Sequence, residues 1–517
     1  MEKYQSQLVE TTFKWIEENP EKKKIYDADM KIWLTDAQLL KSVEQALATM
    51  QDAGLETGDL LLLALPNSAA YVIVYLAAMK LGLDIYSMNP TMPKNRAIEQ
   101  FRKRNYKAAV LTPDYAGYFA ETAQGISERL LTKFGPDDTE IKLTLWQHID
   151  PIDKFDMIPS HSGILMYTSG TTSEPKGVLL SQEQMAIAGE NIIQSHLLTA
   201  QDRIYITLPF HHINAQHIGL ISTLISGGSL IVQKHFSAHR FWPIAEEQAA
   251  TWVTAAPAII SILLNTAIDP VHLTKMRFIR SASAPLPIAA MERFERRFGV
   301  SILNSYGMTE APSQISIDPL PPLRSPEGSS GKPFNIKVRI ANAELTKDYS
   351  TGKDGYIWIQ GPGTISAYLH GRDKDSFLKG WFKTGDMGHF DADGFLYLVG
   401  RSKEMINKSG DKISPYEVEN VIDRLDFIGS SAVVGYPDDI YGETVAAVIV
   451  LKTLAEDRDQ LANYADQIRK IVAENEEKFK IPKYVFFMTE LPHGATGKIQ
   501  RTALKKKLSQ ETGLEKY

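Results

Sequence analysis

The stretch Tyr167-Thr168-Ser169-Gly170-Thr171-Thr172-Ser173-Glu174-Pro175-Lys176-Gly177 directly follows the apolar run Ile164–Met166. It gathers hydroxyl side chains, two glycines and a lysine in one loop, and such donors are suited to wrapping a polyphosphate. A Walker A loop needs Gly-x-x-x-x-Gly-Lys-Ser/Thr, and that spacing is absent, so the stretch does not support a P-loop NTPase. The alternative is an ordinary Ser/Thr-rich surface turn.

Outward from this loop, short β-branched runs alternate with helical patterns between residues 59 and 309. The expected strands are Leu60–Leu65, Ala108–Thr112, Ile204–Leu208, Ser229–Val232, Trp252–Ala255, Phe278–Ser281 and Ile302–Asn304. The expected helices are Ser68–Gly82, Pro243–Ala250, Ala258–Thr266 and Pro287–Phe298. This alternation predicts an α/β fold with mostly parallel strands.

The pattern changes twice in the second half of the chain. After Gly331, short strands with Gly-rich turns, such as Gly355–Gln360 and Gly394–Val399, predict a smaller antiparallel sheet or barrel-like part. Beyond about Arg401 a third pattern begins, with a helix opened by Ser414–Pro415, strands at Ser431–Gly435 and Val445–Leu451, and a polar helix at about Asp457–Glu474. A separate α+β lobe is therefore expected at the C-terminal end.

The composition excludes several function classes. The 517 residues include no cysteine, so a disulfide scaffold, a thiolate metal site and a Cys nucleophile are ruled out, and any thiol must come from outside. The net charge of −6 does not favour binding of nucleic acid, which needs a positively charged surface. We expect no signal peptide, because residues 1–24 are rich in Glu and Lys and contain no apolar run. We expect no membrane span, because Pro66, Asn67 and Ser68 interrupt the most apolar region.

Five motifs resemble the signatures of the adenylate-forming superfamily, which includes acyl- and aryl-CoA synthetases, and they occur in the order known for that family. They are the loop Tyr167–Gly177, Ser305–Glu310, Trp381–Asp386, Gly400–Ile406, and Leu491–Pro492 with Thr496–Arg501. Locally the chain is similar to crotonobetaine/carnitine–CoA ligases, and elsewhere equally similar to succinylbenzoate- and oxalate-CoA ligases.

The resemblance implies an ATP-dependent acid–CoA ligase. A small or medium carboxylic acid would react with ATP to form acyl-AMP and pyrophosphate, and coenzyme A would then displace AMP. The implied cofactors are ATP, Mg²⁺ and coenzyme A. The implied organisation is a large N-terminal body (1–400) of layered α/β sheets, a hinge (401–404) and a smaller mobile lobe (405–517).

The resemblance also implies roles for individual residues. Lys498 would be the catalytic lysine, with Thr309, Glu310 and His212 beside the reacting groups, and Glu310 would also hold the metal. ATP and AMP would be bound by Thr168, Ser169, Gly170, Thr171, Thr172, Lys176, Ser283, Asn304, Tyr306, Gly307, Asp386 and Arg401. Tyr306 would stack on adenine, and Asp386 would accept hydrogen bonds from the ribose hydroxyls.

Further residues would form the hinge and two substrate sites. Lys403 would be the hinge residue. Ser409, Gly410 and Lys412 would contact coenzyme A, and Ile213, Gln216, Ala282 and Met308 would line the acyl pocket. The chain departs from the family pattern at Ser173, Ser409 and His493-Gly494, where relatives carry glycine, glycine and a Lys/Arg-Thr pair.

Other interpretations stay open at this point. The enzyme could pass its acyl-AMP to a separate carrier protein, or the chain could be a non-catalytic paralogue that only binds nucleotide or acyl groups. A zinc site at His211, His212 and His217 is disfavoured, because the spacing matches no zinc motif. The expected location is the cytoplasm, with a role in fatty acid metabolism, and a homodimer stays open.

Overall fold

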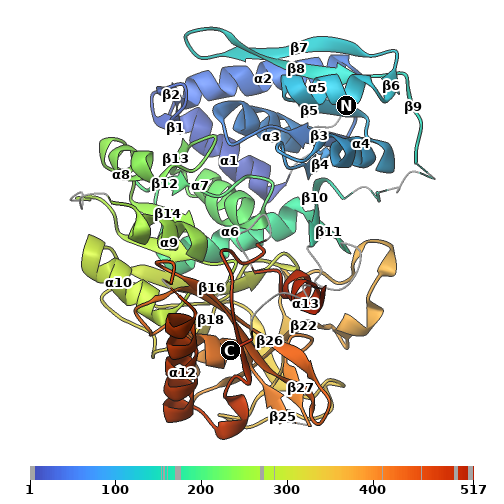
Figure 1. Ribbon diagram of the computed structural model, residues 1–517. Coiled ribbons are helices and arrows are strands. Elements are labelled where there is room, and N and C mark those ends of the chain that lie inside the picture. Colours follow the sequence, from blue (N-terminus) through green and yellow to red (C-terminus); the bar gives the residue numbers. More distant parts are fainter. Residues whose placement is uncertain are drawn as a thin grey trace.

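The computed structural model describes residues 6–517 except residues 153, 155–157, 160, 169–175, 268–272, 285, 410, 456, 494–498 and 511–515. The described residues form sheets of nine, seven, five and five strands and a two-stranded ribbon of β6 (Ala123–Gln124) and β9 (His148–Ile149). The two largest sheets lie above one another with helices between them (Figure 1). The C-terminal lobe lies at the opposite end of the molecule from the seven-stranded sheet.

The seven-stranded sheet carries the strand that leads into the Ser/Thr-rich loop. Its order is β11 (Lys176–Ser181), β10 (Gly163–Thr168), β4 (Asp84–Ser87), β3 (Leu60–Ala64), β5 (Ala108–Leu111), β8 (Thr139–Leu145) and β7 (Ser127–Phe134). All five residues of β3 are buried, and alternate ones belong to different core clusters. Both faces of this strand are therefore covered, as expected for the parallel part of an α/β sheet.

The nine-stranded sheet is parallel in its middle and antiparallel at both ends. Its order is β18 (Lys332–Pro333), β17 (Ala311–Ile317), β16 (Ile302–Met308), β15 (Phe278–Ser281), β14 (Trp252–Ala255), β12 (Arg203–Ile206), β13 (Ser229–Val232), β1 (Lys23–Asp27) and β2 (Ile32–Thr35). Neighbouring strands from β1 to β16 pair in parallel. The carboxyl ends of parallel strands meet at one edge, where ligands of such sheets commonly bind.

Several helices lie between the two large sheets and bury their apolar faces there. These are α1 (Gln7–Glu18), α2 (Asp36–Asp52), α3 (Ala69–Leu81), α6 (Gln182–His196), the π-helix η1 (Asn214–Ile221) and α7 (Ser222–Ile225). Helix α3 is buried at all but two of its positions, and one core cluster joins it to strands of both sheets. The outer helices are α4 (Lys94–Lys103), α5 (Pro113–Ala120), α8 (Ala238–Glu247), α9 (Pro257–Asn265) and α10 (Ile288–Phe298).

The rest of the chain forms two smaller sheets. The first contains β19 (Lys337–Ala341), β20 (Gly355–Gln360), β21 (Phe377–Leu378), β22 (Trp381–Phe390) and β23 (Leu396–Arg401), all antiparallel, with the 3₁₀ turns η2 (Leu369–Gly371) and η3 (Lys374–Ser376) beside it. The second contains β24 (Ile406–Lys408), β25 (Asp411–Ile413), β26 (Ile428–Asp438), β27 (Gly442–Leu451) and β28 (Tyr484–Phe487).

The C-terminal sheet and its helices have core clusters of their own. Helices α11 (Pro415–Ile422) and α12 (Arg458–Asn475) cover one face of this sheet, and α13 (Arg501–Gln510) covers the other; the 3₁₀ turn η4 (Lys478–Lys480) precedes β28. All buried members of these two clusters lie beyond residue 405. A lobe with its own core can fold as a unit.

The predicted α/β class, the antiparallel part after Gly331 and the helix opened by Ser414–Pro415 are confirmed. Several predicted bounds differ slightly from the structure, such as those of β26 and β27, and two differ more. Helix α8 begins at Ala238, so Pro243 lies inside it on the exposed side, because Phe241, Trp242 and Ile244 bury the opposite, apolar face of the helix. Strand β16 continues to Met308, because β17 pairs with it as a hairpin. Among the helices of the described residues, none is long and apolar enough to cross a membrane.

Candidate functional site

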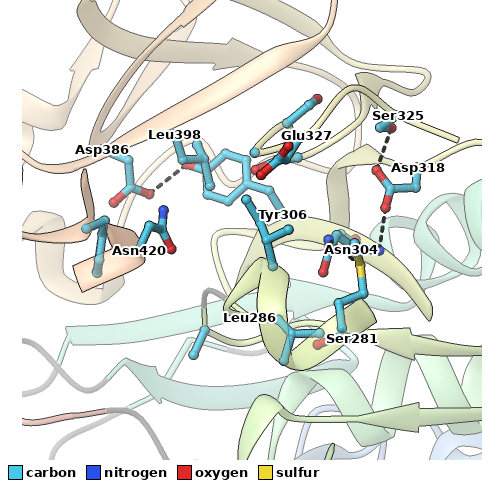
Figure 2. Close-up of a pocket in the computed structure, with 18 of the residues that line it drawn as sticks. Ser281, Leu286, Asn304, Tyr306, Asp318, Ser325, Glu327, Asp386, Leu398 and Asn420 are labelled. Carbon is cyan, nitrogen blue, oxygen red and sulfur yellow. Dashed lines mark hydrogen bonds between the residues drawn. The ribbon is translucent and has the colours of Figure 1, made fainter. Parts of the chain in front are cut away.

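A cavity of about 210 Å³ lies where β15 and β16 of the nine-stranded sheet meet β22 and β23 and helix α11 of the C-terminal lobe. Figure 2 shows Tyr306 in its middle, with Asp386 and Asn420 on one side and Asp318 and Ser325 on the other. The lining includes six residues that the sequence predicts to bind nucleotide, namely Ser283, Asn304, Tyr306, Gly307, Asp386 and Arg401.

The best-defined contacts of this cavity join Tyr306, Asp386 and Arg401. The Tyr306 hydroxyl donates to Asp386 Oδ2 at 2.6 Å, and Arg401 Nε lies 3.1 Å from Asp386 Oδ1. Burial, together with the neighbouring Asp386 charge, raises the pKa of the Tyr306 hydroxyl well above its usual value. The hydroxyl thus stays protonated and holds the carboxylate toward the cavity.

The opposite wall contains an acid that sequence reasoning missed. Asp318 follows β17; its Oδ2 accepts from the backbone N–H of Asn304 at 2.8 Å, and its Oδ1 accepts from Ser325 Oγ at 2.6 Å. Burial raises the pKa of Asp318, and these two hydrogen bonds oppose that effect. Because Asp318 lies outside the five motifs, no pattern along the chain pointed to it.

Ser283 and two residues of α11 complete the lining. Ser283 has a positive φ of 80°, and its Oγ accepts from Asn214 Nδ2 at 3.2 Å, which ties the cavity to η1. Tyr416 and Asn420 reach the cavity from α11, and no motif along the chain predicted that they line it. Pro285 lies outside the described residues.

Glu310, the predicted metal ligand, lies with Thr309 in the turn between β16 and β17 and is buried. Its Oε1 accepts from the Tyr368 hydroxyl at 2.6 Å. Burial raises the pKa of Glu310, and the Tyr368 hydrogen bond opposes this. The described residues contain no group of three or more His, Cys, Asp or Glu side chains that could hold a metal ion. One buried carboxylate fits Mg²⁺ that arrives with nucleotide phosphates, since Mg²⁺ is usually held by one or two carboxylates plus phosphate oxygens.

The Ser/Thr-rich loop is described only at its two ends. Thr168 ends β10 and pairs with Lys176 at the start of β11. The Lys176 ammonium forms an ion pair with Asp373 and lies 4.5 Å from the centre of the Tyr368 ring. Ser169, Gly170, Thr171 and Thr172 lie outside the described residues, as do Gly410 and Lys498.

The residues on either side of the Lys498 segment are described. His493 and Ile499 both line a second cavity of about 410 Å³, which shares Tyr416 and Asn420 with the first.

Two family models match this chain. The model of the AMP-binding enzyme matches residues 12–369, and that of the AMP-binding enzyme C-terminal domain matches residues 417–498. The chain belongs to the AMP-binding enzyme family. The first match ends beside the Tyr368–Glu310 contact, and the second begins in α11, which lines the cavity from the C-terminal lobe.

Relatives of this AMP-binding enzyme include several CoA ligases. An oxalate–CoA ligase of Arabidopsis thaliana is 34% identical, and the match covers 90% of this chain and 92% of that protein. A sulfoacetate–CoA ligase of Cupriavidus necator is 33% identical, covering 87% and 88%. Among solved structures, ATP-bound MatB of Rhodopseudomonas palustris has a TM-score of 0.82 at 24% identity, covering 97% of this chain and 99% of that one. The anthranilate CoA ligase AuaEII with anthranoyl-AMP has a TM-score of 0.83 at 22% identity, with 98% of both chains covered.

The residues predicted to form the acyl pocket are not part of the 210 Å³ cavity. Ile213, Ala282, Met308 and Gln216 are absent from its lining. The amide of Gln216 donates to the Phe210 carbonyl at 2.5 Å and accepts from the Tyr75 hydroxyl at 3.4 Å. His212 is largely buried, and its Nε2 has no hydrogen-bond partner among the described residues. Burial lowers the pKa of His212 to about 4, so the ring is neutral at pH 7.

The predicted hinge and CoA residues lie at the start of the C-terminal lobe. Lys403 is exposed, two residues beyond Arg401, which ends β23. Ser409 lies in the turn between β24 and β25 with a positive φ of 53°, and its backbone N–H donates to the Tyr441 carbonyl at 3.0 Å. Lys412 is exposed in β25. None of these three residues lines either of the two cavities described above.

Proposed function

We propose that this AMP-binding enzyme is an AMP-forming acid–CoA ligase, which activates a carboxylic acid as acyl-AMP and then transfers the acyl group to coenzyme A. The observation that carries the proposal is the shared cavity of Ser283, Asn304, Tyr306, Gly307, Asp386 and Arg401. These residues come from separate segments of the chain, at 283, 304–307, 386 and 401, and all were predicted to bind the same nucleotide. The CoA ligases among the relatives support the same reaction.

In the first half-reaction the carboxylate oxygen would attack the α-phosphorus of ATP and form the acyl–phosphate bond. The bond from that phosphorus to the bridging oxygen would break, and pyrophosphate would leave. Both reactants are anionic, so cations and hydrogen-bond donors must face the phosphates. Lys176 and Arg401 are such cations among the described residues, and Lys498 is proposed as a third. Asp386 would orient the nucleotide by accepting from the ribose hydroxyls.

Mg²⁺ bound through Glu310 and the phosphate oxygens would offset the charge of the triphosphate. The part of this chain is to keep Glu310 in place. The Tyr368 hydroxyl and the turn between β16 and β17 hold the carboxylate within the protein interior.

In the second half-reaction the sulfur of coenzyme A would attack the acyl carbon, and AMP would leave. We propose that the lobe of residues 405–517 turns about Lys403 between the two half-reactions, bringing Lys498 to the site for the first. Ser409, Gly410 and Lys412 would contact coenzyme A during the second. A hinge of this kind needs a loop residue that tolerates a large change in φ and ψ, and exposed Lys403 meets that need.

We propose a compact acid with a second polar or anionic group as the substrate. The segment predicted to face the acid is polar: it contains His212, Asn214 and Gln216, and the buried Nε2 of His212 lacks a partner among the described residues. A buried polar atom without a partner is costly, and a substrate oxygen would remove that cost. The oxalate and sulfoacetate ligases among the relatives act on acids of this class. The proposed location is the cytoplasm.

The test is an acid-dependent exchange of labelled pyrophosphate into ATP, followed by measurement of AMP and thioester after coenzyme A is added. The panel compares oxalate, sulfoacetate, malonate and succinate with acetate, benzoate and octanoate. We expect pyrophosphate exchange with one or more acids, and release of AMP that depends on coenzyme A. The four acids with a second anionic group should give faster exchange than acetate, benzoate and octanoate. No exchange with any acid would refute the ligase. If exchange occurs but coenzyme A yields no AMP and no thioester, the result would instead indicate transfer of the acyl group to a carrier protein.

A further inference from the structure

The segment Ile365–Ser376, here called the clamp segment, connects the metal carboxylate to the end of the phosphate loop. The backbone N–H of Ile365 donates to the Glu310 carbonyl at 2.9 Å, and the Tyr368 hydroxyl bonds the Glu310 side chain. At the other contact, a Cβ placed on Gly177 would lie 2.9 Å from Leu369 Cβ. The clamp segment therefore packs directly on β11, one residue beyond Lys176.

Within the clamp segment, Asp373 forms an ion pair with Lys176, the lysine that is expected to bind phosphate. The Lys176 ammonium pairs with the Asp373 carboxylate above the Tyr368 ring. The Lys176 and Asp373 side chains keep 22% and 35% of their surface exposed. Both groups are thus accessible to a ligand from solvent, and their pairing is of the moderate strength typical of partly exposed ions.

Asp373 interacts with other polar and charged groups besides Lys176. The pKa of Asp373 is below its usual range: burial raises it, but the hydrogen bond and charge of Lys176, the hydrogen bond of Ser376 and the charge of Lys403 together outweigh burial. The carboxylate is consequently anionic at neutral pH. Ser376 and Lys403 would limit the cost of separating it from Lys176.

We propose that Asp373 is an internal counter-ion that competes with the β- and γ-phosphates of ATP for Lys176. The inference rests on the proposed function, since it takes Lys176 as a phosphate ligand. Binding of ATP then replaces the carboxylate with phosphate at the ammonium, and the ion pair forms again as pyrophosphate leaves. Competition by Asp373 weakens the binding of ATP and pyrophosphate but not of AMP, which has no β- or γ-phosphate.

The experiment measures dissociation constants by isothermal titration calorimetry for ATP with Mg²⁺, pyrophosphate with Mg²⁺, and AMP. The variants are Asp373→Asn and, as a matched control, Asp375→Asn. Asp375 is exposed in the same turn and carries the same charge. Asp373→Asn should bind ATP and pyrophosphate about two- to fivefold more tightly, the range for a partly exposed ion pair. Its affinity for AMP should equal that of the wild type, and Asp375→Asn should match the wild type throughout.

Two results would overturn the inference. Unchanged or weaker binding of ATP by Asp373→Asn would mean that the carboxylate does not compete. Equal tightening for AMP, or the same gain in Asp375→Asn, would mean that only the overall charge matters. Asp373→Ser serves as the second variant if the first does not fold, as judged by thermal unfolding. A wild-type chain that binds neither ATP nor pyrophosphate would refute the proposed function, whereas normal binding with no effect of Asp373 refutes this inference alone.

Discussion

Tyr306 and Asp386 lie 80 residues apart in the chain, yet the Tyr306 hydroxyl donates a 2.6 Å hydrogen bond to Asp386 Oδ2. Tyr306 belongs to β16 of the nine-stranded sheet, and Asp386 to β22 of the smaller antiparallel sheet. This contact joins the two sheets at the candidate nucleotide site. It places an aromatic face and a carboxylate at one cavity, as recognition of a nucleoside requires.

Tyr306→Phe should weaken nucleotide binding while keeping the aromatic ring. Asp386 would lose one donor, and a buried carboxylate that loses a hydrogen bond costs about 1–3 kcal/mol. We expect the KM for ATP to rise about fivefold or more, with a smaller change in the KM for the acid. Tyr397→Phe is the control, because its hydroxyl lies 3.5 Å from Asp391, a weak contact outside the cavity lining. Equal effects on both KM values would argue against a nucleotide-specific role.

Lys498→Ala should separate the two half-reactions. Loss of one transition-state donor costs about 10²–10³ in rate, so acid-dependent pyrophosphate exchange should fall by that factor or more. Thioester formation from supplied acyl-AMP should change much less. The control is Lys506→Ala, an exposed lysine on α13. If both half-reactions fell equally, rotation of the lobe would lose its support.

Gly177→Ala should disturb the packing of β11 on the clamp segment. The new Cβ would lie 2.9 Å from Leu369, and such overpacking typically costs about 1–3 kcal/mol. We expect a several-fold higher KM for ATP. The double variant Gly177→Ala/Leu369→Gly removes both Leu369 atoms that the new Cβ would meet at 2.9 Å, Cβ and Cδ2, and should recover part of the loss. Simple additivity of the two single effects would show that Leu369 is not the cause.

His217 should make the fold sensitive to acid. It is fully buried, neither ring nitrogen has a hydrogen-bond partner among the described residues, and burial lowers its pKa to about 3. The unfolded chain therefore binds a proton that the folded one does not, and the free energy of unfolding falls as the pH drops below about 6.5.

The substitution His217→Leu removes this one titrating group. Relative to pH 7, the wild type should lose about 2 kcal/mol more stability at pH 5 than the variant, because one pKa unit corresponds to 1.36 kcal/mol. Urea unfolding at both pH values measures the difference. Parallel pH profiles for the two proteins would show that His217 is not protonated on unfolding.

Much of the fold and part of the site follow from residues close together in the sequence. The apolar runs at Ser229–Val232, Trp252–Ala255 and Phe278–Ser281 were predicted with the bounds that the structure has, because alternation and β-branched residues act over a few positions. Thr309 and Glu310 were also recognised as one motif, although the turn that contains them was not predicted. Both kinds of signal depend on neighbours along the chain.

Tertiary structure decided what no local pattern encodes. Asp318, Tyr416 and Asn420 line the cavity although they belong to no motif, and Lys176 meets Asp373 nearly 200 positions later. Helix α8 begins before Pro243 because its apolar face is buried. The sequence alone thus determined the α/β class, the types of chemical group available and the family. The pairing of these groups depended on packing between sheets and lobes, since side-chain contacts and burial are set by residues that are distant in the chain and close only after folding.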